Sequence, residues 1–154
     1  MPVTDGLDEL YQEVILDHYR KPHHQGLLDN PQLQSEGFNP FCGDQVILNL
    51  TLNDAGRIAE VSFQGQGCSI SQASASILTD HLEGKSLDEA EDLVTTFKGI
   101  MSGNQIPEDQ EETMGDIVVL QGVRQFPIRI KCALLSYTTL QDAIANYRES
   151  IDGD

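Results

Sequence analysis

The sequence predicts an α+β protein in which a small antiparallel β-sheet packs against helices on one side. Two observations carry this prediction. Apolar and polar residues alternate over residues 46–52 and again over 58–64, which is the period of two that strands show. On both sides of this pair, apolar residues recur every three or four positions, which is typical of amphipathic helices. One helix, then paired strands, then further helices is the order expected of this class.

The first predicted helix covers residues 7–20 and ends at Lys21-Pro22, because a proline restricts the residue before it. Residues 23–41 contain two Gly, two Pro and several Asn and Gln, and this composition predicts a long irregular loop that leads to Cys42. The apolar face of the helix is expected to consist of Leu7, Leu10, Tyr11 and Val14.

A β-hairpin is predicted next. The turn falls at Asn53–Gly56, where Gly56 is free to take a positive φ. The second strand ends at Gly65-Gln66-Gly67, directly before Cys68. The apolar faces of the two strands are expected to be Val46, Leu48, Leu50 and Leu52 on the first, and Ala59, Val61 and Phe63 on the second.

Three helices are predicted in the second half of the chain. The first, residues 69–82, is rich in small residues that let a helix lie close to a sheet. The second begins after the capping box formed by Ser86 and Glu89. Residues 102–125 are expected to be irregular, and the last helix runs from about 130 to 147. No internal repeat or boundary is visible, so residues 1–154 are expected to form a single domain.

The composition excludes some classes of partner. The net charge is −16, with 25 acidic against 9 basic residues, so nucleic acid and anionic membranes would repel this surface. No stretch is apolar enough to span a membrane, and no signal peptide is visible at the N-terminus. We therefore expect a cytoplasmic protein.

The three cysteines are the main candidates for chemistry. Their odd number argues against a disulfide framework. Cys42 lies two residues before Asp44, with a glycine between them that lets both side chains converge on one cation. Cys68 and Cys132 fall at predicted helix starts, where the helix dipole, or Arg129 and Lys131 beside Cys132, would lower the pKa of the thiol. Three thiolates and one carboxylate form a donor set suited to zinc, although three buried structural thiols are the alternative.

The four histidines receive a plainer interpretation. His18 and His81 lie on predicted helices and are interpreted as surface or capping residues. His23-His24 can lend a metal ligand, but adjacent histidines at the start of a loop are usually only solvated.

The sequence around each cysteine resembles a known family. The motifs are N-P-F-C-G-D at 39–44, G-Q-G-C-S-I-S at 65–71 followed by A-S-A-S at 73–76, and R-I-K-C-A-L at 129–134. Together with residues 10–22, they are similar to the NifU/IscU-like proteins of iron–sulfur cluster assembly. This resemblance implies the NifU/IscU-like fold and a metal site formed by Cys42, Asp44, Cys68 and Cys132.

Three departures point to one branch of that family. Lys131 stands where the scaffold members have a histidine, residues 125–129 do not match their Leu-Pro-Pro-Val-Lys chaperone motif, and residues 107–122 are an extra segment. These features resemble the SufU branch. That resemblance implies a zinc-dependent sulfurtransferase whose partners are a SufS-type cysteine desulfurase and a downstream SufBCD-type assembly complex.

The resemblance also suggests roles for single residues. Cys42 is the expected acceptor of persulfide sulfur because it ends a loop, and Cys132 is the second choice. Arg129 is expected to steady the docked geometry, which makes Cys42 and Arg129 the catalytic pair. Two alternatives stay open: an iron–sulfur cluster scaffold that uses the same ligands, and a structural zinc module that binds partners without chemistry.

Overall fold

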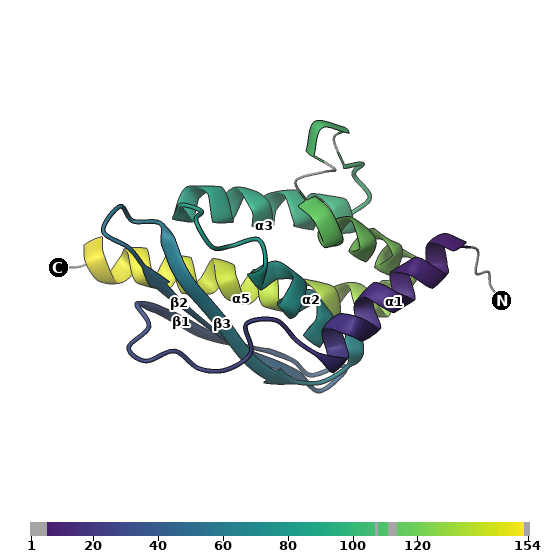
Figure 1. Ribbon diagram of the computed structural model, residues 1–154, viewed down its shortest axis with the longest axis horizontal. Coiled ribbons are helices and arrows are strands. Elements are labelled where there is room, and N and C mark those ends of the chain that lie inside the picture. Colours follow the sequence, from purple (N-terminus) through teal and green to yellow (C-terminus); the bar gives the residue numbers. More distant parts are fainter. Residues whose placement is uncertain (1–5, 107, 111–113, 153–154) are drawn as a thin grey trace.

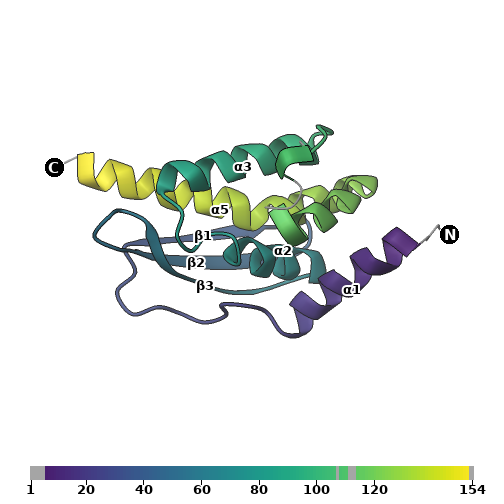
Figure 2. The same cartoon turned by 45° about the horizontal axis from the view of Figure 1, so that its top comes forward.

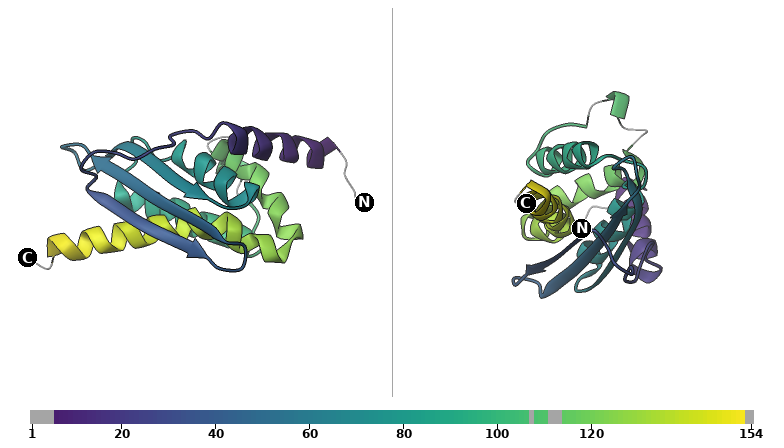
Figure 3. Two further views of the ribbon diagram at one scale, coloured as in Figure 1. Left: turned by 90° about the horizontal axis from the view of Figure 1, so that it is seen from below. Right: turned by 90° about the vertical axis from the view of Figure 1, so that its left-hand side faces the viewer.

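The computed structural model describes residues 6–106, 108–110 and 114–152. Three strands, β1 (Leu33–Asn39), β2 (Asp44–Leu52) and β3 (Ile58–Gln66), form one antiparallel sheet in the order β1-β2-β3. Figure 1 shows the helices gathered over one face of this sheet, and the end-on view in Figure 3 shows the other face free of helices. The predicted fold class is therefore confirmed.

The predicted hairpin is present as β2 and β3. Val46, Leu48 and Leu50 are buried on the helix-covered face of β2, as their alternation predicted. On β3, however, Ile58 is buried and Ala59 is exposed, so the prediction for Ala59 is wrong. The reason is a shift of register at Thr51–Leu52, which changes the face on which the first residues of β3 lie.

Strand β1 is the element that the sequence interpretation missed, because residues 23–41 were expected to be irregular throughout. Its residues pair with β2 from Leu33↔Leu50 to Asn39↔Asp44. Only Leu33 and Asn39 are buried in this edge strand, so no apolar alternation marks it in the sequence. Cys42 consequently lies in the tight turn at residues 40–43 that joins β1 to β2.

The helices form layers above the sheet, as Figure 2 shows. Helix α5 (Pro127–Asp152) lies over β1 and β2, and α2 (Ser69–Thr79) lies beside it over β3. Helix α3 (Leu87–Met101) packs on α5 from the outside, and α1 (Gly6–Arg20) contacts α2. The capping box of Ser86 and Glu89 is present at the start of α3, as predicted.

Helix α2 is the central helix. Every residue from Ser71 to Thr79 is buried, because α2 has β3, α1, α5 and the 3-10 helix η2 around it. Small side chains permit this burial: Ser74 donates a hydrogen bond to the Ala133 carbonyl of α5 at 2.7 Å. The prediction was that small residues let this helix lie close to the sheet. It does lie against β3, and its small side chains also bring it close to α5.

The segment before α5 is more ordered than predicted. Residues 108–110 form a short 3-10 turn, η1, and Gly115–Gln125 form η2, which buries Ile117, Leu120 and Val123. Residues 107 and 111–113 of this segment lie outside the described residues, as do the side chains of Leu7, Leu10 and Tyr11. Helix α5 buries Ala133, Tyr137, Leu140 and Ile144, which recur at helical spacing.

None of the helices in the described part of the chain combines the length and the apolar content needed to cross a bilayer.

Candidate metal centre

Three separate elements bring the cysteines and Asp44 together. Cys42 lies in the β1–β2 turn, where Gly43 takes φ +68°. Asp44 is the first residue of β2, and the alternation of that strand points its side chain to the buried face. Cys68 is the N-cap of α2, and Cys132 lies in the second turn of α5.

The four side chains form one cluster. One donor atom each from Cys42, Asp44 and Cys132 lies within 4.8 Å of the others, and the two sulfur atoms are 3.2 Å apart. Cys68 Sγ lies 3.8 Å from Oδ2 of Asp44, which connects the fourth residue to the group. All four residues expected to bind metal are therefore neighbours in the fold.

Backbone and amide groups fix Asp44 within the cluster. Oδ1 accepts a hydrogen bond from the Cys68 N–H at 2.8 Å, and Oδ2 accepts one from Asn39 Nδ2 at 3.2 Å. Asn39 also lies 3.6 Å from Cys132 Sγ, so a single buried amide contacts two candidate ligands. The sequence interpretation gave Asn39 no role. Its place directly before Pro40 in the first cysteine motif was the only signal.

Burial and hydrogen bonding act differently on the acidic groups. Burial opposes ionisation of Asp44, but hydrogen bonds from the Cys68 backbone and from nearby side chains outweigh it, and the pKa of Asp44 lies below its ordinary value. Burial raises the pKa of the Cys132 thiol well above its ordinary value, and hydrogen bonds with Cys42 and Asp44 raise it further. Four such groups cannot all be ionised together unless a cation shares the site.

The predicted lowering of the pKa of Cys132 is therefore wrong for the thiol by itself. Helix α5 begins at Pro127, so Cys132 is not at a helix start, and its side chain is fully buried. Arg129 and Lys131 are exposed, and their charges are consequently screened by water. The desolvation of Cys132 is the larger effect.

The donor set fits a zinc ion. Two thiolates on one tetrahedral zinc lie roughly 3.8 Å apart when the Zn–S bond is about 2.3 Å. The Cys42 and Cys132 sulfur atoms are 3.2 Å apart, somewhat closer than this value, and Cys68 Sγ lies 3.8 Å from the carboxylate of Asp44. Three sulfur donors and one carboxylate are also the ligand types that zinc accepts.

A cation and apolar side chains border the outer side of the cluster. Arg129 Nη1 lies 3.7 Å from Cys42 Sγ, and its contacts with the cysteines, Cys132 first, raise the pKa of the guanidinium. Lys131 Nζ lies 4.5 Å from the centre of the Phe41 ring, a cation–π contact that ties the Cys42 turn to α5. A surface cleft of about 660 Å³ is lined by Phe41, Cys42 and residues 125–129.

The sequence that contains these residues is similar to known proteins. The sequence pattern of the NifU-like N terminal domain matches residues 10–133. The zinc-dependent sulfurtransferase SufU of Bacillus subtilis (strain 168) is 41% identical over 145 residues, which cover 94% of this chain and 96% of that protein. The iron–sulfur cluster assembly scaffold protein IscU of Streptococcus pyogenes serotype M1 is 40% identical, covering 90% of this chain and 84% of that protein.

Solved structures agree with this grouping. One is described as a candidate iron–sulfur cluster assembly scaffold protein for the SUF system, from Fervidobacterium islandicum AW-1. It has a TM-score of 0.77 and 33% identity, and the match covers 88% of this chain and 97% of that chain. A NifU-like protein from Brucella abortus superposes with a TM-score of 0.81 over 93% of this chain and 97% of its own; at 22% identity it supports the fold alone.

Proposed function

This chain belongs to the family of NifU-like N-terminal domains, and from that premise we propose that it serves iron–sulfur cluster assembly as a zinc-binding acceptor of persulfide sulfur. The sulfur donor is a cysteine desulfurase of the SufS type, and a SufBCD-type assembly complex receives the sulfur next. The relative named as a zinc-dependent sulfurtransferase supports this proposal, as does the donor set of Cys42, Asp44, Cys68 and Cys132.

Cys42 is the proposed acceptor, because the three thiols differ in how easily a donor can reach them. Cys132 is fully buried in α5, and Cys68 accepts a hydrogen bond from the Ser71 N–H that caps α2. Cys42 is half-buried in a four-residue turn and borders the open cleft. It is thus the thiol that an incoming donor can reach without opening a helix.

The transfer is a thiolate exchange without net oxidation. Cys42 Sγ, as the thiolate, attacks the terminal sulfur of the donor's persulfide, and a new S–S bond forms on Cys42. The original S–S bond of the donor breaks, and its cysteine leaves as a thiolate. Arg129, 3.7 Å from Cys42 Sγ, offers a permanent positive charge that stabilises the anionic sulfur before and after the exchange.

Zinc bound by the four ligands would keep the thiols deprotonated at neutral pH and shield them from oxidation. The surrounding residues hold the site for it. Asn39 and the Cys68 N–H orient Asp44, and the turn glycine Gly43 lets Cys42 and Asp44 face the same point. Orientation of this kind by outer residues is typical of zinc proteins.

The second candidate function is an iron–sulfur cluster scaffold. The 40% identity to the scaffold protein of Streptococcus pyogenes favours it, and the same four donors would serve. Lys131 favours the sulfur acceptor over the scaffold, because its side chain contacts the Phe41 ring and adds no soft ligand to the cluster.

The decisive experiment locates the transferred sulfur. Zinc-loaded protein is incubated with a SufS-type cysteine desulfurase and cysteine, and its peptides are analysed by mass spectrometry without reductant. We expect one added sulfur on the peptide that contains Cys42, and faster cysteine turnover by the desulfurase. Sulfur found on Cys132 instead would contradict the acceptor assignment. A coloured protein with bound iron and no added sulfur would favour the scaffold.

Matched variants separate chemistry from metal binding. Cys42→Ala should end the gain of sulfur, and it also removes one of the four proposed zinc ligands. Arg129→Ala removes no ligand, so it should slow the gain of sulfur while the zinc content stays at the wild-type level. Arg20→Ala, an exposed arginine on α1, is the control and should transfer sulfur at the wild-type rate. Asp44→Ala should lower the zinc content, measured by metal analysis of purified protein, and unchanged zinc would remove Asp44 from the ligand set.

A further inference from the structure

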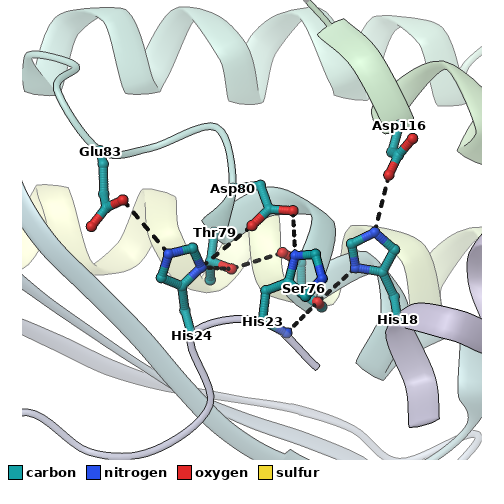
Figure 4. Close-up of polar contacts among 8 residues, drawn as sticks. All are labelled: His18, His23, His24, Ser76, Thr79, Asp80, Glu83 and Asp116. Atoms are coloured by element: carbon teal, nitrogen blue, oxygen red, sulfur yellow. Dashed lines mark hydrogen bonds and ion pairs between the residues drawn. The ribbon is translucent and has the colours of Figure 1, made fainter. Parts of the chain in front are cut away.

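All four histidines of the chain lie in one region of the molecule, away from the cysteines. His18 comes from the end of α1, His23 and His24 from the loop after it, and His81 from the segment that follows α2. Asp80 and Asp116 are among the charges that act on His81, together with His18. Figure 4 shows His18, His23 and His24 side by side around the C-terminal end of α2. We call His18, His23, His24, Asp80 and Asp116 the histidine cluster.

His18 is buried, whereas the sequence suggested a surface or capping residue. Ser76 Oγ accepts a hydrogen bond from the His23 backbone N–H at 2.8 Å, so its own proton is available for His18 Nδ1, 2.7 Å away. The other ring nitrogen, Nε2, lies 3.1 Å from Asp116 Oδ2 and donates to it. Because Nε2 is occupied by Asp116, Nδ1 is the ring nitrogen of His18 that can turn from Ser76 to a metal ion.

Asp80 lies between the other two histidines. Its Oδ2 is 2.7 Å from His23 Nδ1, and its Oδ1 is 3.4 Å from His24 Nδ1. His24 Nδ1 also lies 3.0 Å from Thr79 Oγ1, whose proton is already donated to the Ser76 carbonyl. His24 Nδ1 therefore donates to Thr79 Oγ1, and the same ring lies beside the Asp80 carboxylate.

We propose that His18, His23 and Asp80 form a second metal site, one that binds a divalent transition-metal ion such as zinc. One ring nitrogen of each histidine and one oxygen of Asp80 all lie within 4.8 Å of one another. Two imidazoles and a carboxylate are a ligand set for transition metals rather than for Ca²⁺ or Mg²⁺. Binding displaces the proton between His23 and Asp80 to solvent, and His18 exchanges its bond from Ser76 for the metal.

The surroundings are suited to a cation. Asp116 holds the outer nitrogen of His18, which is the carboxylate–histidine arrangement found behind metal-bound imidazoles. The site lies at the C-terminal end of α2, where the helix dipole favours positive charge. Glu83 lies 3.6 Å from His24, which is not one of the three proposed ligands. Half of the His23 side chain is exposed, so an ion can enter from solvent.

The experiment counts metal ions bound to the full-length protein. Protein carrying zinc at its thiol site is dialysed to equilibrium against Co²⁺, and metal per chain is measured for the wild type and variants. We expect a second ion whose absorption shows cobalt d–d bands without thiolate charge transfer. His23→Gln and Asp80→Asn should each lose this ion, and Asp116→Asn should weaken its binding about 10–100-fold.

The matched control is Glu83→Gln, which removes a carboxylate beside the cluster but none of the three ligands. This variant should still bind the second ion. If it loses the ion as well, or if the wild type binds only one metal, the proposed site is wrong. Retention of the second ion by both His23→Gln and Asp80→Asn would overturn it equally.

This inference does not depend on the proposed sulfur transfer. His23→Gln should accept sulfur from the desulfurase at the wild-type rate while it loses the second ion. Failure of the sulfur assay in the wild type would contradict the proposed function only, and a missing second ion would contradict the histidine site only.

Discussion

Gly67 controls the shape of the candidate metal centre although it has no side chain. It has φ +141°, and a Cβ at this position would overlap Asp44 Oδ1 and lie 2.8 Å from Asp44 Cα. Only glycine therefore lets the chain pass Asp44 and deliver the Cys68 N–H to its carboxylate. The geometry of Asp44, a proposed zinc ligand, therefore depends on a neighbouring residue that has no side chain.

Replacing Gly67 with alanine should empty the thiol site. The strain of the backbone costs about 1–3 kcal/mol of folding free energy, and relief of the overlap moves Asp44 away from the cysteines. We expect a lower free energy of unfolding in urea and a large loss of zinc by metal analysis. Gly26→Ala is the matched control, because Gly26 has φ +133° but open space at its Cβ. It should lose stability and keep its zinc; equal zinc loss in both variants would mean that strain alone weakens the site.

At the residue scale, the sequence predicted the ligand types but not their environment. The motifs led to Cys42, Asp44, Cys68 and Cys132, which do lie together. They did not reveal that Asn39 bonds to two of these residues, since an amide beside a proline usually marks only a turn. The burial of His18 also depends on contacts with Ser76 and Asp116, 58 and 98 residues away, and local sequence carries no sign of such contacts.

At the scale of an element, the N-terminus of α3 offers a test of acid stability. The Ser86 backbone N–H bonds to the Glu89 carboxylate, and Arg57 lies 2.9 Å from the same carboxylate. These contacts hold the pKa of Glu89 below its ordinary value of 4.5. Because the pKa is lower in the folded state, the contribution of Glu89 to stability is complete above pH 4.5 and is lost as the pH falls further.

Glu89→Gln should therefore remove part of the acid sensitivity of folding. We expect the variant to be less stable than the wild type at neutral pH, and the difference to shrink below pH 4.5. Urea unfolding at both pH values measures this change. Asp92→Asn, which removes an exposed carboxylate later in the same helix, is the control for the loss of one negative charge. A difference for Glu89→Gln that is constant with pH would contradict the assignment.

Elements with an apolar period could be predicted, and elements without one could not. Helix α3 and the β2–β3 hairpin follow from alternation, a turn and a capping box. Strand β1 is held by backbone pairing to β2 and has few buried side chains, so its sequence looks like that of a loop. The 3-10 helix η2 buries Ile117, Leu120 and Val123 at a period of three. Three apolar residues at this spacing are too few to distinguish a 3-10 helix from an irregular segment in the sequence.

At the scale of the whole molecule, α2 should be the last part to open. Its residues 71–79 are all buried between the sheet and three helical segments, so its amides can exchange with solvent only when the surrounding layers separate. Hydrogen–deuterium exchange of the zinc-loaded protein should be slowest for residues 69–79 and faster for the edge strand β1 and for η2. Exchange in α2 as fast as in η2 would show that α2 opens locally.

Helix α2 also connects the two metal sites proposed for this protein. Cys68 caps its first turn, and Asp80 caps its last. An α-helix turns by about 100° and advances about 1.5 Å for each residue. If Cys68 stays in the cysteine cluster, inserting or deleting a single residue in α2 would therefore rotate Asp80 about the helix axis and away from the histidines. The length of this buried helix therefore fixes the orientation of the thiol site relative to the histidine site. Homologues that bind metal at both sites should keep the number of residues in α2 unchanged.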